Sequence, residues 1–99
     1  MSKTKFFKGN FPDPEFYMYI GKHGDWKVYV DRNVNNEGFY KIKVVSMIPR
    51  PKANFYLDFG LEKNDLVDNK SRFSLREMYP HDAYDIEEII KSYFRGGSK

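Results

Sequence analysis

The stretch FYKIKVVSMI, from Phe39 to Ile48, decides the fold, because apolar and polar residues alternate along it. Two other runs share this pattern, namely DWKVYVD from Asp25 to Asp31 and NFYLDFGL from Asn54 to Leu61. In each run the large apolar residues fall on one parity, and the Lys, Tyr and Asp residues fall on the other. Alternation with period two is typical of strands in an antiparallel sheet that is buried on one side. The three runs therefore predict a sheet with one apolar face and one polar face.

The remaining strands are predicted from shorter signals. Residues 16–20 form an apolar run that predicts a first strand, and a turn at Gly21–Gly24 joins it to the strand Trp26–Val30. The Asn-rich segment Asp31–Gly38 is expected to be a long exposed hairpin loop. The prolines at 49 and 51 end the third strand, since each removes a backbone hydrogen-bond donor.

The segment before the last element allows two interpretations. Glu62–Arg72 is polar and predicts turn and loop, with one helical turn at Asp65–Asp68 as an option. Phe73–Tyr79 fits either a short strand or a single helical turn capped by Ser74. Pro80 ends this segment in both interpretations.

A helix is predicted from about Asp82 to Arg95. Its apolar residues recur at helical spacing and form one stripe, which comprises Ile86, Ile89, Ile90, Tyr93 and Phe94. Asp85 and Glu88 have the spacing of a capping box, and Asp82 is the competing N-cap. Gly96 stands where a left-handed C-terminal cap is expected.

These elements predict one α+β domain over residues 16–95, with a basic N-terminal arm at 1–15 and a flexible tail at 96–99. Its architecture is a four- to five-stranded antiparallel sheet, meander-like, with one C-terminal α-helix packed on one face. The predicted inward-facing residues are Phe16, Met18, Ile20, Trp26, Val28, Val30, Tyr40, Ile42, Val44, Ile48, Phe55, Leu57 and Phe59. One helix, about 10 Å across, covers only part of a four-stranded face about 20 Å wide. The arm or a second copy of the chain must cover the rest, so the sequence is compatible with a homodimer.

The amino-acid composition limits the classes of protein to which the chain can belong. The chain has 99 residues with eight Tyr, nine Phe and one Trp, enough for one small core. The absence of Cys excludes disulfides, thiolate metal sites and cysteine nucleophiles. Residues 1–9 lack the apolar part of a signal peptide, and no run approaches the ~18 apolar residues of a membrane span, so we expect a cytoplasmic protein.

Residues 1–57 carry ten Lys and Arg against five Asp and Glu, whereas residues 58–99 carry seven against nine. The basic sheet half favours an anionic partner.

The polar parity of the strands interleaves tyrosines with lysines. The candidate site residues on this outer face are Tyr17, Tyr19, Lys27, Tyr29, Lys41, Lys43 and Tyr56, with Arg50 and Lys52 of the proline-containing loop extending the basic surface. Phe39 shares their parity. Bases stack on aromatic rings while lysines neutralise phosphates, so this pattern is typical of a surface for single-stranded nucleic acid. The same residue types also suit the partly solvent-exposed face of any antiparallel sheet. The proline-containing loop has an alternative interpretation as well, because prolines protect a strand crossover from aggregation.

The sequence shows no catalytic or metal-binding motif. His23 stands near Asp25, and His81 stands beside Asp82, but neither pair has further ligands at a recognised spacing. Glu87 and Glu88 fall on the expected wet side of the helix, which lacks the cleft that separates the pKa values of paired carboxylates. We therefore expect a non-enzymatic protein without a cofactor or a metal.

The order of four strands followed by one helix resembles the topology of the transcriptional-coactivator and whirly group of single-strand binders, which dimerise through that helix. The resemblance is one of element order alone. The leading hypothesis is a binding domain for single-stranded nucleic acid. Its affinity should fall with added salt and in the variants Tyr29→Ala and Lys43→Ala. The alternative is a small protein-interaction module, such as an inhibitor or accessory factor encoded by a virus or mobile element. Its contact would use the sheet edge, loop 33–38 or loop 49–52.

Overall fold

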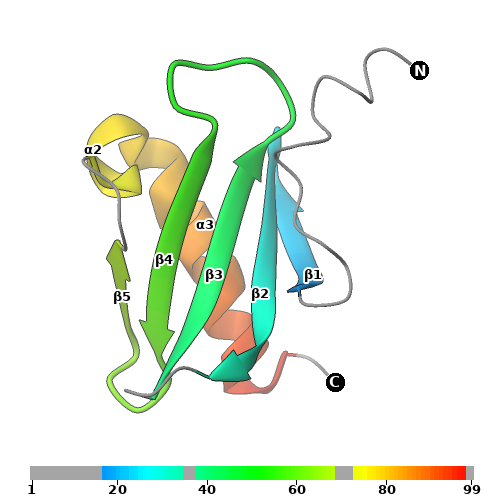
Figure 1. Cartoon of the computed structure of the whole chain (residues 1–99), viewed down its shortest axis with the longest axis vertical. Coiled ribbons are helices and arrows are strands. Elements are labelled where there is room, and N and C mark those ends of the chain that lie inside the picture. The colour runs from blue at the N-terminus through cyan, green and yellow to red at the C-terminus, as the bar shows by residue number, and fades with distance from the viewer. Residues whose placement is uncertain (1–16, 35–37, 69–72, 98–99) are drawn as a thin grey trace.

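A computed structural model describes residues 17–34, 38–68 and 73–97 and shows a single sheet with helices packed on one side (Figure 1). The elements are β1 (Tyr17–His23), β2 (Trp26–Val34), β3 (Phe39–Ser46), β4 (Asn54–Gly60), β5 (Asp65–Asp68), α2 (Leu75–Met78) and α3 (Pro80–Ser92), followed by a wide helical turn at Tyr93–Gly97. The strands lie side by side in chain order, and each pairs antiparallel with the next. The predicted α+β meander with its C-terminal helix is confirmed, whereas the predicted arm at 1–15 and Phe16 lie outside the described residues. Within the described ranges no helix is long and apolar enough to cross a membrane.

Four strand assignments differ from the prediction. β1 continues to His23, into the segment expected to be a turn. β2 continues to Val34, into the segment expected to be a loop, with a shift in its register to β3 after Val30. Asp65–Asp68 forms β5 instead of a helical turn, because β4 supplies hydrogen-bond partners and Leu66 is buried in the core. β3 ends at Ser46, so Ile48 lies beyond the strand and is 41% exposed, not inward-facing as predicted.

The segment before the C-terminal helix is helical, not extended. The backbone N–H of Glu77 donates a hydrogen bond of 3.0 Å to the Ser74 hydroxyl, which is the N-cap of α2. Pro80 does not simply end this segment, because it is the first residue of α3. At the first helical position a proline loses no hydrogen bond and already has a helical φ.

This early start overturns both predicted caps of α3. Asp82, Asp85 and Glu88 all lie inside the helix, and Tyr79 is the N-cap residue without a side-chain hydrogen bond. At the other end Gly96 has a φ of 108°, so the left-handed conformation expected there is confirmed.

The core lies between one face of the sheet and the two helices. It comprises Trp26, Val28, Val30, Ile42, Val44, Phe55, Leu57, Phe59, Leu66, Leu75, Ala83, Ile86 and Ile90, with Met18, Ile20, Tyr40, Ile89, Tyr93 and Phe94 partly buried against it. The ring of Phe94 packs on Tyr40 and Phe59, with centroids 4.7 Å and 4.9 Å apart. Leu75 is fully buried, so α2 covers a part of the sheet that one helix would leave open. The homodimer stays a prediction.

A β-bulge in β1 reverses the alternation of its side chains. The pairing of β1 with β2 shifts by one residue between Tyr19 and Gly21. Gly21 consequently faces α3, where a Cβ atom would lie only 2.9 Å from Cγ2 of Ile89. The same reversal places His23 against α3 and Lys22 on the outer face.

Candidate functional site

The outer face of the sheet carries a continuous row of side chains across four strands. Tyr19 of β1 pairs with Tyr29 of β2, which pairs with Lys43 of β3, which pairs with Tyr56 of β4. We call these residues the tyrosine row. The pairs stand in register, so the row runs straight across the strands. The sequence predicted each of these residues on this face, and the structure brings them together.

Two lysines of this face lie over tyrosine rings. Nζ of Lys43 is 5.0 Å from the ring centroid of Tyr56, and Nζ of Lys27 is 5.7 Å from that of Tyr19. The rings of Tyr19 and Tyr29 are tilted against each other, with centroids 5.6 Å apart. Tyr19 is 50% exposed and Tyr56 38%, so both ends of the tyrosine row offer ring surface to a ligand.

The two other tyrosines of the face are held more tightly. Burial raises the pKa of Tyr17 above 10.0, and the nearby Asp31 and Tyr56 raise it further. Burial raises the pKa of Tyr29 above 10.0 as well, with a smaller contribution from Tyr19. Like other tyrosines, both phenols are neutral at physiological pH and keep a hydroxyl that can donate a hydrogen bond.

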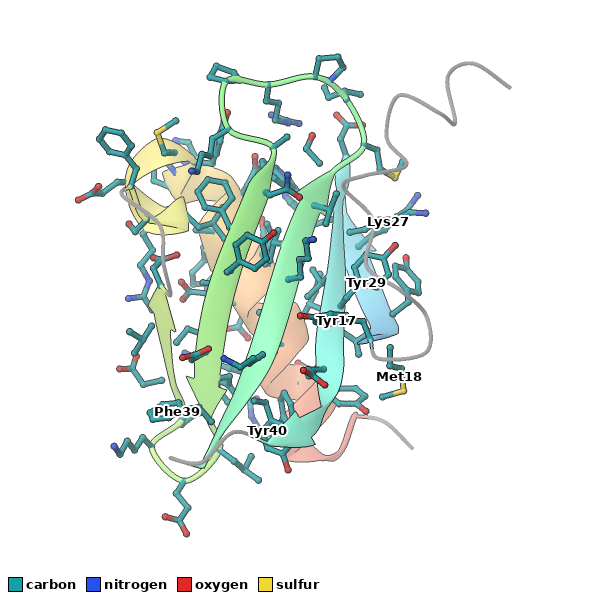
Figure 2. The ribbon with its side chains drawn as sticks, in the orientation of Figure 1. Tyr17, Met18, Lys27, Tyr29, Phe39 and Tyr40 are labelled. Carbon is teal, nitrogen blue, oxygen red and sulfur yellow. The ribbon has the colours of Figure 1, made fainter. Side chains whose placement is uncertain are left out.

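A second row lies beside the tyrosine row and is basic. Lys22 pairs with Lys27, Lys27 with Val45, and Val45 with Asn54, and we call these residues the lysine row. Neither row contains a carboxylate. The carboxylates of the outer face, Asp31, Asp58 and Asp65, stand nearer the other end of the strands, where Lys41 pairs with Asp58. Positive charge is therefore concentrated on one half of the face (Figure 2, in which Lys27 and Tyr29 are labelled).

The sequence missed three members of the lysine row, namely Lys22, Val45 and Asn54. Lys22 was assigned to a turn, whereas β1 continues to His23 and the bulge shifts its register so that Lys22 pairs with Lys27. Val45 has the parity of the outer face, yet it is completely buried. No pattern in the sequence indicated this, because alternation alone expects a solvated side chain at that position.

Arg50 does not belong to this face. Its guanidinium lies 4.7 Å from the ring centroid of Trp26 and 5.4 Å from that of Tyr79, on the helix side of the sheet. Its Nε donates to the Ser46 hydroxyl at 2.7 Å, and a terminal nitrogen lies 3.4 Å from the carboxylate of Asp25. The predicted role of Arg50 in binding is therefore not supported by its position.

Lys52 lies half-buried in the loop between β3 and β4, beyond the strand ends. The loop joins β3, which ends at Ser46, to β4, which begins at Asn54, and the contribution of Lys52 to the basic surface stays a prediction. The side chain of Lys41, by contrast, is half-buried on the outer face as predicted.

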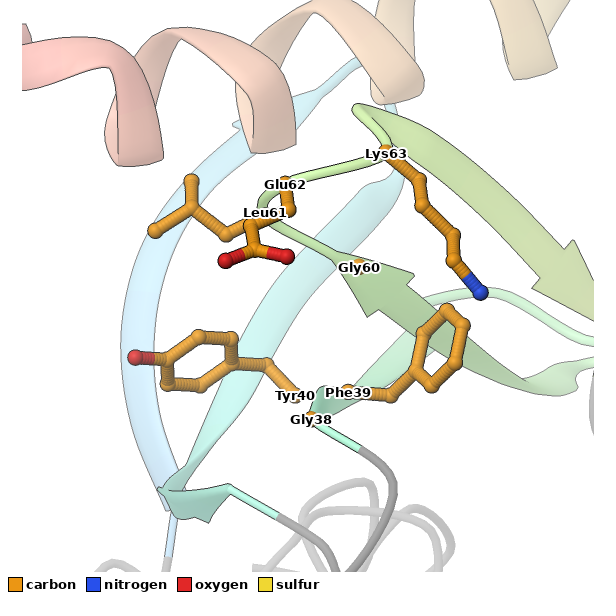
Figure 3. A pocket seen from close by; sticks show the side chains of 7 residues that line it. All are labelled: Gly38, Phe39, Tyr40, Gly60, Leu61, Glu62 and Lys63. Carbon is orange, nitrogen blue, oxygen red and sulfur yellow. The ribbon is translucent and has the colours of Figure 1, made fainter.

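A hollow of about 280 Å³ lies at the end of the sheet where β3 begins and β4 ends (Figure 3). Phe39 and Tyr40 flank it, Gly60 lies at its base, and Glu62 and Lys63 of the following turn lie along its rim. Nζ of Lys63 is 5.1 Å from the ring centroid of Phe39. The sequence gave no indication of this hollow, because its residues come from a strand end and a turn.

The structure places His23 against two carboxylates of α3. Nε2 of His23 lies 3.2 Å from Oδ1 of Asp82 and 3.5 Å from Oδ2 of Asp85. Asp82 also accepts a hydrogen bond of 3.0 Å from the indole of Trp26, so its contacts fix α3 to the sheet. Among the residues the structure describes, no group of three or more potential ligands is placed to hold a metal ion.

Comparison with protein families, with curated proteins and with solved structures finds no match. The resemblance to the coactivator and whirly group is also weakened by the fold, because β5 and α2 intervene between the fourth strand and the long helix.

Proposed function

We propose that the protein binds single-stranded nucleic acid on the outer face of its sheet. The observation that carries the proposal is the tyrosine row with its two lysine–tyrosine contacts, next to the lysine row. An open sheet with exposed rings is a surface on which two or three unpaired bases can stack. Each stacked base contributes roughly 1–3 kcal/mol, and the contribution depends little on sequence.

The spacing of the exposed rings suits a short single strand. Tyr19 and Tyr56 are three strands apart, which is about 14 Å at ~4.8 Å per strand. A run of stacked nucleotides at about 3.4 Å each would cover this distance with roughly four nucleotides. A duplex buries its base faces in its own stack, so exposed tyrosine rings favour an unpaired strand.

The lysine row supports an anionic ligand for a second reason. Lys22 and Lys27 stand directly opposite each other on neighbouring strands. Like charges in this position destabilise a sheet by a few tenths of a kcal/mol. A phosphate bound between the two ammonium groups would remove this repulsion.

The test is a fluorescence-anisotropy titration with labelled single-stranded oligonucleotides at two salt concentrations. With phosphates neutralised by Lys22, Lys27 and Lys43, the slope of log affinity against log salt is about −2, at −0.7 per contact. Affinity should then fall roughly twentyfold between about 50 and 200 mM salt. Lys43→Ala should reduce this slope by about 0.7. Tyr56→Ala should weaken binding by roughly 5- to 160-fold, which corresponds to the loss of one stacked base at about 1–3 kcal/mol.

Matched controls are available on the helix side. Tyr84 of α3 is 67% exposed, and Tyr84→Ala removes the same ring from the opposite side of the molecule without changing the outer face. Lys22→Gln adds a second readout, because it should weaken binding while leaving the melting temperature equal or higher. Equal affinity for the wild type, Tyr56→Ala and Lys43→Ala would refute the proposal. Absence of any binding would also refute it and would favour the protein-interaction alternative.

A further inference from the structure

The charges of the outer face are distributed along a diagonal. Lys22 is the first residue of the lysine row and lies on β1, at one edge of the described sheet. Asp65 lies on β5, at the other edge, and pairs with Gly60, which pairs with Phe39. The side chains of Lys22 and Asp65 are both exposed. The outer face therefore has a basic corner and, diagonally opposite, an acidic corner.

The two corners are equally far from the middle of the face. Lys22 is level with Val45 of β3, whereas Asp65 is level with Phe39. Val45 and Phe39 are each three positions from Ile42, in opposite directions, which is about 10 Å along a strand. β1 and β5 each lie two strands from β3, which is also about 10 Å. A two-fold axis that runs parallel to the face, above Ile42 and diagonal to the strands, therefore exchanges the two corners.

A second copy of the chain placed by this axis meets the first with opposite charges. Lys22 of one copy lies over Asp65 of the other, and the same contact occurs a second time with the roles reversed, as in every two-fold interface. The strands of the two sheets then cross at about a right angle, which is one of the two common arrangements of sheets packed face to face. The charge pattern makes the outer face complementary to itself.

The same axis brings an exposed ring to the hollow at the end of β3. Tyr19 is 50% exposed and lies about 10 Å to the side of β3, about 3 Å along the strands from the level of Ile42. A diagonal axis exchanges distances across the strands with distances along them, so this ring arrives where Phe39 lies against Gly60. The hollow beside the Phe39 ring offers space for it (Figure 3). One aromatic pair would then form in each half of the interface.

The size of the face indicates how strong such a dimer can be. Five strands at ~4.8 Å and about seven residues at ~3.3 Å each cover roughly 500 Å². Two copies would bury about 1,000 Å² in total, which is at the lower limit for a specific interface. A dimer of this size should be reversible, and its charged contacts should be sensitive to salt.

We propose that the protein forms a two-fold dimer through the outer faces of its sheets, in which Lys22 of each copy contacts Asp65 of the other. This dimer differs from the one expected from the sequence, which would have covered the apolar face of the sheet. The inference does not depend on nucleic-acid binding. The two ligands share the tyrosine row, however, so a single strand and a second copy should exclude each other.

The test is sedimentation equilibrium of the full chain, with charge reversals at the two exposed corners. Lys22→Glu and Asp65→Lys should each weaken self-association at least about tenfold, because two attractions per dimer become repulsions. An equal mixture of the two variants should associate as tightly as the wild type, since both contacts between them again join opposite charges. The double variant should recover in the same way. Glu88→Lys, an exposed reversal on α3, is the control and should change nothing.

The aromatic contact has its own matched pair of variants. Tyr19→Ala should weaken self-association at least about fivefold, because the contact occurs twice in the dimer. Tyr84→Ala, on the helix side, should have no effect. A wild type that is monomeric at every concentration overturns the proposal. Single reversals that associate like the wild type, or a mixture that does not recover, also overturn it.

A titration of the dimer with oligo(dT) separates this inference from the proposed function. Bound strand should dissociate the dimer, and a dimer that persists with the strand bound would show that self-association uses another surface. If no strand binds, the proposed function is refuted, and the mixture of Lys22→Glu with Asp65→Lys still decides whether the dimer forms.

Discussion

Removal of the Asp82 carboxylate should destabilise the fold through the only tryptophan. The indole of Trp26 is 1% exposed, and its Nε1 donates a hydrogen bond of 3.0 Å to Oδ2 of Asp82. The other carboxylate oxygen lies 3.2 Å from Nε2 of His23. In Asp82→Ala the N–H of the buried indole loses its acceptor. Such a change leaves a buried donor unpaired, which costs about 1–3 kcal/mol.

We expect Asp82→Ala to lower the free energy of unfolding by about 2 kcal/mol, the middle of that range. For a domain of this size the melting temperature should then fall by roughly 8–16 °C. The assay is urea unfolding followed by the fluorescence of Trp26, with circular dichroism as a second probe. Coincident transitions from the two probes would justify a two-state analysis.

Two further variants identify the cause. Asp82→Asn removes the charge but keeps an acceptor for the indole, so it should lose less than half as much stability. Asp85→Ala removes the other carboxylate near His23, which is half-exposed, and should cost below about 1 kcal/mol. If Asp82→Asn is as unstable as Asp82→Ala, charge near the start of α3 is responsible and the reasoning about Trp26 is wrong. A loss below about 0.5 kcal/mol in Asp82→Ala would contradict it too.

Two predictions concern titration. Burial raises the pKa of Asp68 above 3.8, against the lowering effect of its hydrogen bond from the Leu75 N–H. The folded state then holds this proton more strongly than the unfolded state, so the contribution of Asp68 to stability falls as pH rises from 3.8 through the raised pKa. Asp68→Asn should remove this slope and be at least as stable as the wild type at neutral pH, as measured by urea unfolding across pH. The pKa values of Tyr17 and Tyr29 lie above 10.0, so both phenols should ionise at higher pH than an ordinary tyrosine. In a pH titration followed by tyrosinate absorbance, this high-pH part of the increase should disappear in the Tyr17→Phe, Tyr29→Phe double variant. A double variant that titrates like the wild type would contradict the assignment.

The faces of the sheet were predictable because alternation is a local property of an extended chain. Trp26, Ile42 and Leu57 are at most 3% exposed, as expected from their parity. Tyr29 and Lys43 stand on the opposite face in one register. The bulge in β1 could not be predicted in this way, because it depends on the fit of Gly21 against Ile89 of a helix distant in the sequence.

The predictions of the helix boundaries and of the short strand β5 were wrong for a related reason. Asp82, Asp85 and Glu88 all offered capping patterns, and local sequence could not rank them. The structure uses Asp82 as the acceptor for Trp26, a residue 56 positions away. β5 has only four residues, too few for periodicity to distinguish a strand from a helical turn. Its pairing with β4 decides between them.

Arg50 and Lys43 illustrate the difference between a cation that the fold uses and a cation that is available to a ligand. Arg50 and Lys43 both lie about 5 Å from an aromatic ring centroid, so the ring contact alone does not distinguish them. Arg50 also contacts a second ring, a hydroxyl and a carboxylate, and a ligand would have to replace all of these. Lys43 stands in a row without carboxylates, and a phosphate would add to its contact with Tyr56 instead of competing with it. Composition marks both residues as candidates, and the contacts around each cation separate them: Arg50 is held by several contacts of the fold, whereas Lys43 is a residue that we propose for anion binding.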